Sequence, residues 1–187
     1  MSLSLTKEVL TKYKNKYFVE TGTFTGGAVQ LALDCGFEMV RSIESNVTLF
    51  KECAIKFKDN INVQLYLGTS QVRLFEMSFD IKEPITFWLD GHNMGYDEED
   101  GIPIYTELLI IGLHPIKTHT ILIDDIRMFG KEDTNLGWKN INLDEVINRI
   151  KFINPNYKIT YEDSNNGPKD ILVAYIGEAN ENIRGTE

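Results

Sequence analysis

Carboxylates stand at the ends of several short apolar segments of this chain. Glu20 ends the segment YFVE and Glu44 ends RSIE, whereas Asp90 ends FWLD. Asp124 and Asp125 follow the apolar segment ILI. Acids at the ends of buried strands can attract a cationic ligand, hydrogen-bond hydroxyl groups or bind a divalent ion. Each of these five residues is therefore a candidate for ligand binding.

A glycine-rich turn follows Glu20 directly. The stretch TGTFTGG places Gly22, Gly26 and Gly27 between an apolar segment and a helical pattern. Glycine in such a turn permits positive φ and lets a ligand approach the backbone closely. The spacing Gly-x-x-x-Gly-Gly differs from the dinucleotide fingerprint G-x-G-x-x-G, and Glu20 would repel a pyrophosphate. The turn therefore favours a cationic or amino-bearing ligand, with a purely structural glycine turn as the alternative.

Two later turns extend this predicted ligand site. Glu44 lies 22 residues after Gly22, close to the spacing at which an acid in an α/β sheet binds ribose hydroxyl groups. The alternative for Glu44 is an ordinary charge near the N-terminus of the next helix. Gly68, Thr69 and Ser70 follow the segment LYL, where they could face an adenine edge or cap a helix. A nucleoside would be held by such a set of turns.

The three aspartates suggest a divalent cation if their segments form neighbouring strands. The ends of adjacent strands are about 4.8 Å apart, and carboxylates that close require a counter-ion or a proton. Mg²⁺ binds a few carboxylates together with water and substrate oxygens, so Asp90, Asp124 and Asp125 are its predicted ligands. The alternative is that Asp124 or Asp125 only caps or hydrogen-bonds a neighbouring turn. His92 follows in a turn where it can transfer a proton, although a lone histidine is more often structural.

Apolar segments and helical patterns alternate along the chain, which places these acids at one edge of a sheet. Strands are expected at Tyr17–Glu20, Met39–Glu44, Asn62–Leu67, Ile85–Asp90 and Thr120–Asp124. Helices are expected at Gly27–Cys35, Val47–Lys58, Ser70–Phe79, Tyr105–Leu113 and Leu143–Ile153, with a further N-terminal helix over residues 1–16. The alternation predicts an α/β fold, a Rossmann-like doubly wound sheet. The segments YKITYED and DILVAYI predict a closing antiparallel hairpin at 157–176, joined by SNNGPK.

Composition narrows the class of protein and of partner. The chain has 187 residues, of which 42% are hydrophobic and 25% charged, as expected for one soluble domain over residues 1–187. The net charge of −9 argues against nucleic acid as a partner. No apolar run approaches the ~18 residues of a membrane span, and no secretion signal opens the chain. Two cysteines, interpreted as buried free thiols, favour a cytoplasmic location; the oligomeric state stays open, a dimer included.

These segments resemble the class I S-adenosylmethionine-dependent methyltransferases across nearly the whole chain. VETGTFTGGAVQLAL is similar to their first motif, and SIES is similar to their ribose-binding second motif. The resemblance implies a seven-stranded sheet of order 3-2-1-4-5-7-6, the last strand antiparallel, with helices on both faces. It also implies the cofactor S-adenosylmethionine, with the acid and turn of motif one at its methionine part. The implied cofactor-binding residues are Glu20, Gly22, Thr23, Phe24, Gly26, Glu44, Ser45, Gly68, Thr69, Ser70 and Asp90.

More narrowly, FWLDGH and ILIDD are similar to the metal-binding segments of cation-dependent O-methyltransferases of the catechol type and of the macrocin or sugar type. Asp90, Asp124 and Asp125 match the ligand positions. His92 stands where the sugar type has an aspartate as general base, which leaves the base and the acceptor open. The resemblance implies O-methylation of a small hydroxylated acceptor such as a sugar or glycan, assisted by Mg²⁺, with His92 and Asp90 catalytic. Loops at 94–100 and 126–140 would overhang this site, and Arg127, Met128, Phe129 and Trp138 could line an acceptor pocket; the alternative is that they are surface-loop residues without such a role.

Two other functions remain as alternatives. A nicotinamide-dependent oxidoreductase would require tighter glycine spacing, and its short-chain version a Tyr-x-x-x-Lys pair. None of the eight tyrosines has lysine four residues later. A catalytically silent domain of the same fold, binding a cofactor or a partner protein, is the second alternative. The acids at the expected sheet edge argue against it.

Overall fold

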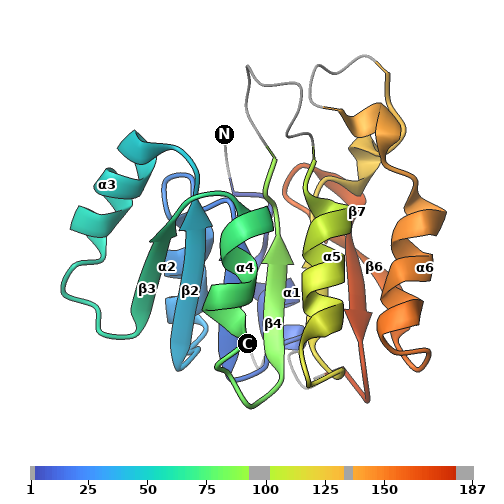
Figure 1. The fold of residues 1–187 in the computed structure, drawn as a ribbon, viewed down its shortest axis with the longest axis horizontal. Helices are drawn as coiled ribbons and strands as arrows, with labels where there is room; N and C mark the ends of the chain where they lie inside the picture. Colours follow the sequence, from blue (N-terminus) through green and yellow to red (C-terminus); the bar gives the residue numbers. More distant parts are fainter. Residues whose placement is uncertain (1–2, 93–101, 133–136, 180–187) are drawn as a thin grey trace, which may run out of the picture.

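The computed structural model describes residues 3–92, 102–132 and 137–179. These residues form a seven-stranded sheet of order β3-β2-β1-β4-β5-β7-β6 with helices packed against it (Figure 1). The strands are β1 (Tyr17–Thr21), β2 (Met39–Glu44), β3 (Val63–Leu67), β4 (Ile85–Leu89), β5 (Thr120–Ile123), β6 (Lys158–Ser164) and β7 (Gly167–Tyr175). β7 runs antiparallel to both of its neighbours, while β1 to β5 pair in parallel. The predicted fold class and strand order are confirmed.

Helices cover both faces of the sheet (Figure 1). One face carries α1 (Lys7–Lys12), α2 (Gly27–Asp34) and α3 (Val47–Lys56), and the other carries α4 (Ser70–Ser78), α5 (Ile104–Leu113) and α6 (Leu143–Ile153). Two short 3-10 helices follow β5, namely η1 (Ile126–Met128) and η2 (Trp138–Asn140). Within the residues described, none of these helices has the length and apolar character needed to cross a membrane.

The central strands are apolar throughout because successive side chains enter different hydrophobic clusters. In β4, Phe87 and Leu89 pack with α4, α5 and α6, whereas Trp88 packs among residues of α1, α2 and α3. All three side chains are buried. A strand buried on both faces needs this continuous apolar run, and its carboxyl end is thereby fixed between two layers of helices.

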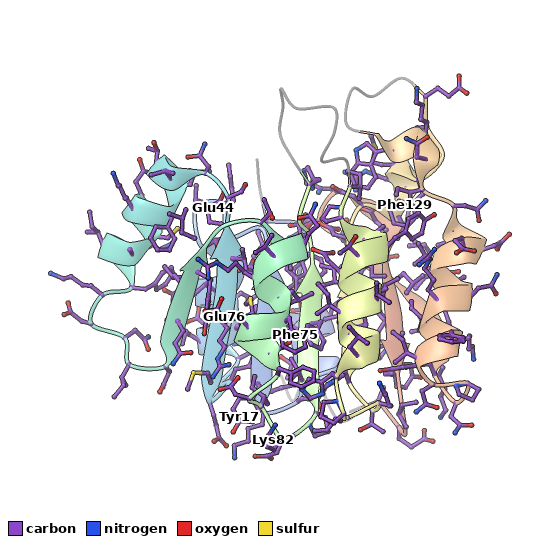
Figure 2. All side chains as sticks on the ribbon, in the orientation of Figure 1. Tyr17, Glu44, Phe75, Glu76, Lys82 and Phe129 are labelled. Atoms are coloured by element: carbon purple, nitrogen blue, oxygen red, sulfur yellow. The ribbon has the colours of Figure 1, made fainter. Side chains whose placement is uncertain are left out.

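Register brings the acids to one edge of the sheet. Thr21 in β1 lies opposite Ile43 in β2 and Leu89 in β4, and Leu89 lies opposite Ile123 in β5. The backbone N–H of Asp90 then donates to the carbonyl of Thr21 at 3.3 Å. Glu44 and Phe129 lie at this edge, while Tyr17 and Lys82 lie at the opposite edge of the sheet (Figure 2).

The N-terminal helix is shorter than the sequence indicates. Instead of occupying most of residues 1–16, α1 spans Lys7–Lys12. The hydroxyl of Thr6 accepts a hydrogen bond from the N–H of Val9 at 3.2 Å and caps the helix, which ends at Tyr13. Before the cap, Leu5 is buried in the core. Local helical pattern cannot distinguish this extended, core-packed segment from another turn of helix.

The closing hairpin has longer strands and a tighter turn than predicted. β6 extends to Ser164 and β7 begins at Gly167, so most of the expected SNNGPK turn belongs to the strands. A register shift between Glu162 and Ser164 lets the strands continue, and the N–H of Lys169 donates to the Asp163 carboxylate at 2.8 Å. Because these contacts involve side chains and a bulge, turn composition alone predicts too wide a turn, with the first strand ending one residue early and the second beginning three residues late.

Two histidines without predicted chemistry form a buried pair that fastens the connection before β5. His119 Nδ1 accepts from the N–H of Ile85 at 3.0 Å, and its Nε2 lies 3.0 Å from His114 Nδ1. His114 Nε2 lies 3.2 Å from the carbonyl of Ser78. This network assigns a neutral tautomer to each ring, with Nε2–H as the donor. Burial, with a smaller contribution from the charge of His114, lowers the pKa of His119 to about 3.

We expect this pair to make the fold sensitive to acid. Histidine in the unfolded chain has a pKa near 6.5, so below that pH the unfolded state binds a proton that folded His119 refuses. The stabilisation is complete above about pH 6.5 and is lost toward pH 3. The free energy of unfolding should fall by about 2 kcal/mol from this residue between pH 6.5 and 5.

Urea unfolding at a series of pH values measures this effect. His119→Asn keeps a hydrogen-bonding side chain but cannot titrate, so the loss of stability in acid should be smaller in that variant. Equal losses in the two chains would show that His119 does not carry the acid sensitivity.

Candidate functional site

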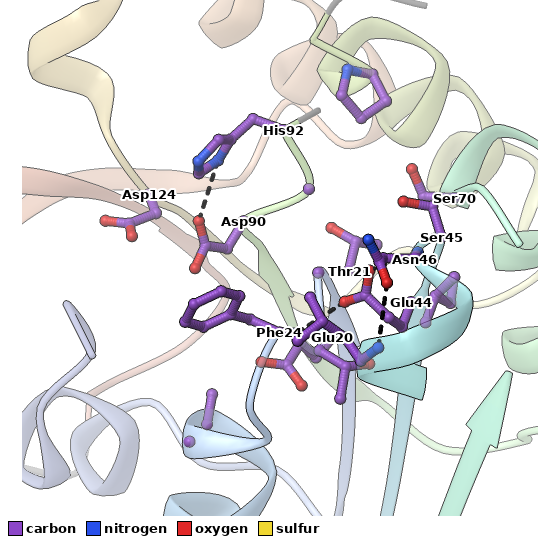
Figure 3. A pocket seen from close by; sticks show the side chains of 18 of the residues that line it. Glu20, Thr21, Phe24, Glu44, Ser45, Asn46, Ser70, Asp90, His92 and Asp124 are labelled. Carbon is purple, nitrogen blue, oxygen red and sulfur yellow. Dashed lines mark hydrogen bonds and ion pairs between the residues drawn. The ribbon is translucent and has the colours of Figure 1, made fainter. Parts of the chain in front are cut away.

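A cavity of about 650 Å³ opens at the carboxyl edge of the central strands (Figure 3). Its volume lies within the usual range for a small-molecule or cofactor site. Thirteen of the residues predicted from sequence line it: Glu20, Gly22, Thr23, Phe24, Glu44, Ser45, Gly68, Thr69, Ser70, Asp90, His92, Asp124 and Asp125. The turns after β1, β2, β3, β4 and β5 therefore meet around one space.

Gly26 does not line this cavity. It has φ +74° at the N-terminus of α2, and a Cβ atom on it would approach the ring of Phe57 to 2.5 Å. The structure thus gives Gly26 a packing role, because only a glycine lets the turn lie against this ring. Its predicted contact with a cofactor has no counterpart in the lining of the cavity.

Glu20 is a buried acid on the cavity wall. The hydroxyl of Ser42 donates to its Oε2 at 2.6 Å and lies 2.6 Å from the hydroxyl of Thr23. Burial raises the pKa of Glu20 well above its ordinary value, and the charges of Asp90 and Glu44 act in the same direction. A cationic group in the cavity would reverse this shift, so the position suits an ammonium group better than an anion.

Glu44 fastens two turns of the site together. Its carboxylate accepts from the N–H of Phe24 at 2.7 Å and from the N–H of Asn46 at 2.8 Å. A carboxylate has about four acceptor positions, so Glu44 can still bind ligand hydroxyl groups. Asn46, rather than Glu44, caps α3 by accepting from the N–H groups of Thr48 and Leu49. The structure therefore favours a role for Glu44 in lining the cavity over a role as a charge at the N-terminus of α3.

The turn after β1 uses most of its backbone donors internally. The N–H groups of Gly22 and Thr23 donate to the carbonyl of Ile43 at 3.0 and 2.9 Å. Phe24, at φ +49°, donates to Glu44, and the N–H of Gly26 donates to the carbonyl of Thr23. A phosphate-binding turn must offer such N–H groups to its ligand. The geometry therefore disfavours a pyrophosphate at this turn.

Three aspartates crowd the other side of the cavity. Burial raises the pKa of Asp124 to about 8, with the charges of Asp90 and Asp125 adding to the shift. Burial also raises the pKa of Asp90. Asp124 Oδ2 accepts from the hydroxyl of Ser4, while its buried Oδ1 has no hydrogen-bond partner among the residues described. This orphaned oxygen is the kind of atom that a cation would satisfy.

The potential metal ligands fall into two overlapping groups. Within the described parts of the chain, ligand atoms lie within 4.8 Å of one another in the group Asp90, His92 and Asp125 and in the group Asp124, Asp125 and Asp170. The predicted trio is thus divided between them, with Asp125 in common. Asp170 is not among the ligands predicted from the sequence; it reaches this edge because β7 runs antiparallel to β5. Arg127 lies between the acids, 2.6 Å from Asp125 Oδ1 and also paired with Asp170.

His92 lies against the same acids (Figure 3). Its Nδ1 is 3.5 Å from Asp90 Oδ1 and 4.0 Å from Asp125 Oδ2, and its ring packs near Trp138. Burial alone lowers the pKa of His92, but the carboxylates of Asp90, Asp125 and Asp124 outweigh it and raise the pKa. With Nδ1 directed at Asp90, Nε2 is the nitrogen left for a ligand.

Residues from both ends of the chain complete the cavity. Leu3, Ser4 and Asn166 line it, and the backbone of Ser4 accepts from the N–H of Asn165 at 2.9 Å. No local sequence signal marks these contacts, since they join segments about 160 residues apart.

The loop side chains predicted for an acceptor pocket are distributed between two spaces. Arg127 lines the main cavity, whereas Phe129 and Trp138 line a separate space of about 20 Å³ next to His92. Met128 lines neither of these two cavities. The acidic loop at 94–100 lies outside the described residues, as do residues 133–136.

Comparison with known proteins identifies the fold. No protein-family model and no curated protein sequence matches the chain. Among solved structures, it is similar to the O-methyltransferase TomG from Streptomyces achromogenes, involved in tomaymycin synthesis and bound to S-adenosylmethionine, with a TM-score of 0.60 and 13% identity over 91% of this chain and 77% of that one. It is also similar to an O-methyltransferase from Bacillus cereus in complex with S-adenosylhomocysteine, with a TM-score of 0.61 and 13% identity over 91% and 78%.

A third similar structure, from Clostridium thermocellum, is described as a candidate rRNA-methylase. Its TM-score is 0.59 at 15% identity, over 92% of this chain and 94% of that one. This chain therefore has the Rossmann-like fold that these methyltransferase structures share.

Proposed function

We propose that this protein is an S-adenosylmethionine-dependent O-methyltransferase that acts on a small hydroxylated acceptor and uses a divalent cation. The observation that carries the proposal is the division of one cavity into two acidic parts. Glu20 and Glu44 lie at the carboxyl ends of β1 and β2, while Asp90, His92 and Asp124 lie on the other side (Figure 3). A donor and an acceptor bound in these parts would be adjacent.

The residues of the first part fit this cofactor. A sulfonium and an ammonium group carry positive charge, which suits the buried acid Glu20. Ribose hydroxyl groups can donate to the acceptor positions of Glu44 that the backbone leaves free. Nicotinamide dinucleotides carry a pyrophosphate, and Arg127 is the one lysine or arginine among the described residues that line the cavity. Because Arg127 is paired with Asp125 and Asp170, it offers little compensation for such an anion.

The chemistry requires alignment and removal of one proton. S-adenosylmethionine, when bound, supplies a methyl group whose carbon–sulfur bond breaks as the acceptor oxygen bonds to carbon, the electron pair leaving on S-adenosylhomocysteine. The cavity walls hold the two reactants in line, an effect that can reach ~7–11 kcal/mol in well-oriented systems. We assign the acceptor proton to Nε2 of His92, while Asp90 orients the ring through Nδ1.

The acidic edge fits a divalent cation. Asp124 and Asp125 would hold it together with Asp90 or Asp170, and the orphaned Oδ1 of Asp124 would gain a partner. A cation there would lower the pKa of an acceptor hydroxyl group and fix its position. The same acids disfavour polyanionic acceptors, which supports a neutral hydroxylated molecule such as a sugar over RNA.

The proposal predicts that the protein binds this cofactor. Calorimetry should detect binding of S-adenosylmethionine and of S-adenosylhomocysteine but no binding of NAD. Gly22→Ala should abolish this binding, because φ is +90° and the new Cβ would lie 2.7 Å from the carbonyl oxygen of Asp90.

Gly177→Ala is the matched control for Gly22→Ala. Its φ is +87°, yet no atom lies within 4 Å of an added Cβ, so it introduces similar backbone strain without the collision. It should therefore keep the affinity of the unchanged protein. NAD binding alone would favour the oxidoreductase alternative, and equal affinities in the two variants would exclude a tight approach at Gly22.

Substitution of Asp124 should have opposite effects on the stability of the protein and on its binding of a cation. In EDTA, Asp124→Asn should raise the free energy of unfolding by roughly 1–3 kcal/mol, because burial and the charges of Asp90 and Asp125 penalise the ionised form of Asp124, a cost that asparagine does not carry. Mg²⁺ should raise the melting temperature of the unchanged protein and have little effect on this variant.

The control for Asp124→Asn is Asp59→Asn, since Asp59 has an exposed carboxylate. It should respond to Mg²⁺ like the unchanged protein. If Mg²⁺ does not change the melting temperature of the unchanged protein, the proposed cation site is wrong, whereas the proposed binding of the cofactor is not affected.

Proton transfer by His92 is tested by His92→Gln in a screen of small sugars and catechols for release of S-adenosylhomocysteine. We expect turnover to fall by about 10²–10⁴-fold, while affinity for S-adenosylhomocysteine changes little. Undiminished turnover would exclude His92 as the base. A protein that binds the cofactor but shows no turnover with any acceptor, RNA included, would match the silent-domain alternative.

A further inference from the structure

A buried acid outside the main cavity supports the turn that carries Asp90 and His92. Glu107 lies in the first turn of α5 and is 1% exposed. It does not line the main cavity, but it lines the small space of about 20 Å³ that also contacts Asp90 and His92. A glutamate near the start of a helix is usually a solvent-facing charge, so the burial of Glu107 has no counterpart in the local sequence pattern.

The carboxyl group of Glu107 lies against the glycine between the two functional residues. A Cβ atom on Gly91 would be 3.2 Å from Glu107 Oε1 and 3.0 Å from the hydroxyl of Thr21. Gly91 has no positive φ, so glycine is needed here for space rather than for backbone conformation. The turn Asp90–His92 therefore rests directly on these two polar side chains.

Glu107 also joins this turn to two cavity-lining residues. The nearby hydroxyl groups of Ser70, at the start of α4, and of Thr21, at the end of β1, both act to lower the pKa of its carboxyl group, although the Thr21 hydroxyl completes no hydrogen bond among the described residues. Thr21 and Ser70 line the main cavity, and the carbonyl of Thr21 accepts from the N–H of Asp90. Glu107 Oε1 has no hydrogen-bond partner in the described part of the chain, so its burial is not explained by a completed structural network.

We propose that Glu107 is a positioning residue that fixes the turn Asp90–Gly91–His92 relative to the ends of β1 and α4. This role rests on the proposed function for its purpose, but the geometry itself can be tested without any acceptor. Burial raises the pKa of Glu107 to about 7, so below that pH glutamine matches its protonated carboxyl group in shape and hydrogen bonding. Alanine would remove the support and leave space beside Gly91.

The test uses the imidazole NMR signals of the full chain. Only three histidines are present, and His114 and His119 pair with each other at the other edge of the sheet, so His92→Gln assigns the third signal. At one fixed pH, Glu107→Ala should shift the His92 signal toward that of a solvent-exposed histidine and leave the other two in place. Glu107→Gln should retain the original position.

Ile111→Val provides the structural control, because it removes a buried methyl group one turn further along α5. It should leave all three histidine signals unchanged. Calorimetry with S-adenosylhomocysteine gives a second readout, with affinity about tenfold weaker in Glu107→Ala and near normal in Glu107→Gln.

A His92 signal unmoved in folded Glu107→Ala, or moved equally by Glu107→Gln and by Ile111→Val, would overturn the positioning role. If the unchanged protein does not bind S-adenosylhomocysteine, the proposed function fails, whereas the NMR comparison still decides the role of Glu107.

Discussion

The constraint on which this site depends is the crowding of five buried or partly buried acidic side chains at the carboxyl edge of the sheet. Glu20, Glu44, Asp90, Asp124 and Asp125 all contact one cavity, and Arg127 is the one lysine or arginine facing it from the described residues. Each acid consequently has a specific partner: a hydroxyl group, backbone N–H groups, an imidazole or the guanidinium group. The cost of burying these charges is tolerated because the strands below are fixed by apolar packing on both faces. A cationic ligand in each part of the cavity would lower that cost.

Sequence patterns predict most of this arrangement because a parallel sheet converts order along the chain into proximity at one edge. The strands FWL and ILI are apolar to their ends, so Asp90 and Asp124 had to emerge together once their strands were neighbours. Asp170 and Ser4 could not be found in this way. The first depends on an antiparallel strand, and the second reaches Asp124 across 120 residues through one hydroxyl group. Such contacts leave no periodic signal.

The glycine turn shows a second limit of local patterns. Gly22 and Gly26 share a turn, and both have positive φ, yet they serve different neighbours. Gly22 lets β1 approach the carbonyl of Asp90, whereas Gly26 lies against the ring of Phe57, which follows α3. Nothing in TGTFTGG separates these roles, because the deciding atoms belong to other elements. The backbone N–H groups of this turn also donate hydrogen bonds within the protein, which the composition of the turn cannot reveal.

Arg127 adds an electrostatic asymmetry to the acidic edge. Because its guanidinium group pairs with Asp125 and Asp170, part of the negative charge there is already compensated. Asp124 and Asp90 have no such partner, and burial raises the pKa of both. The carboxyl groups without a guanidinium partner therefore lie at the ends of β4 and β5, next to His92. A cation attracted to this point would lie beside the nitrogen proposed to receive the acceptor's proton, so the position of Arg127 directs both to the same side of the cavity.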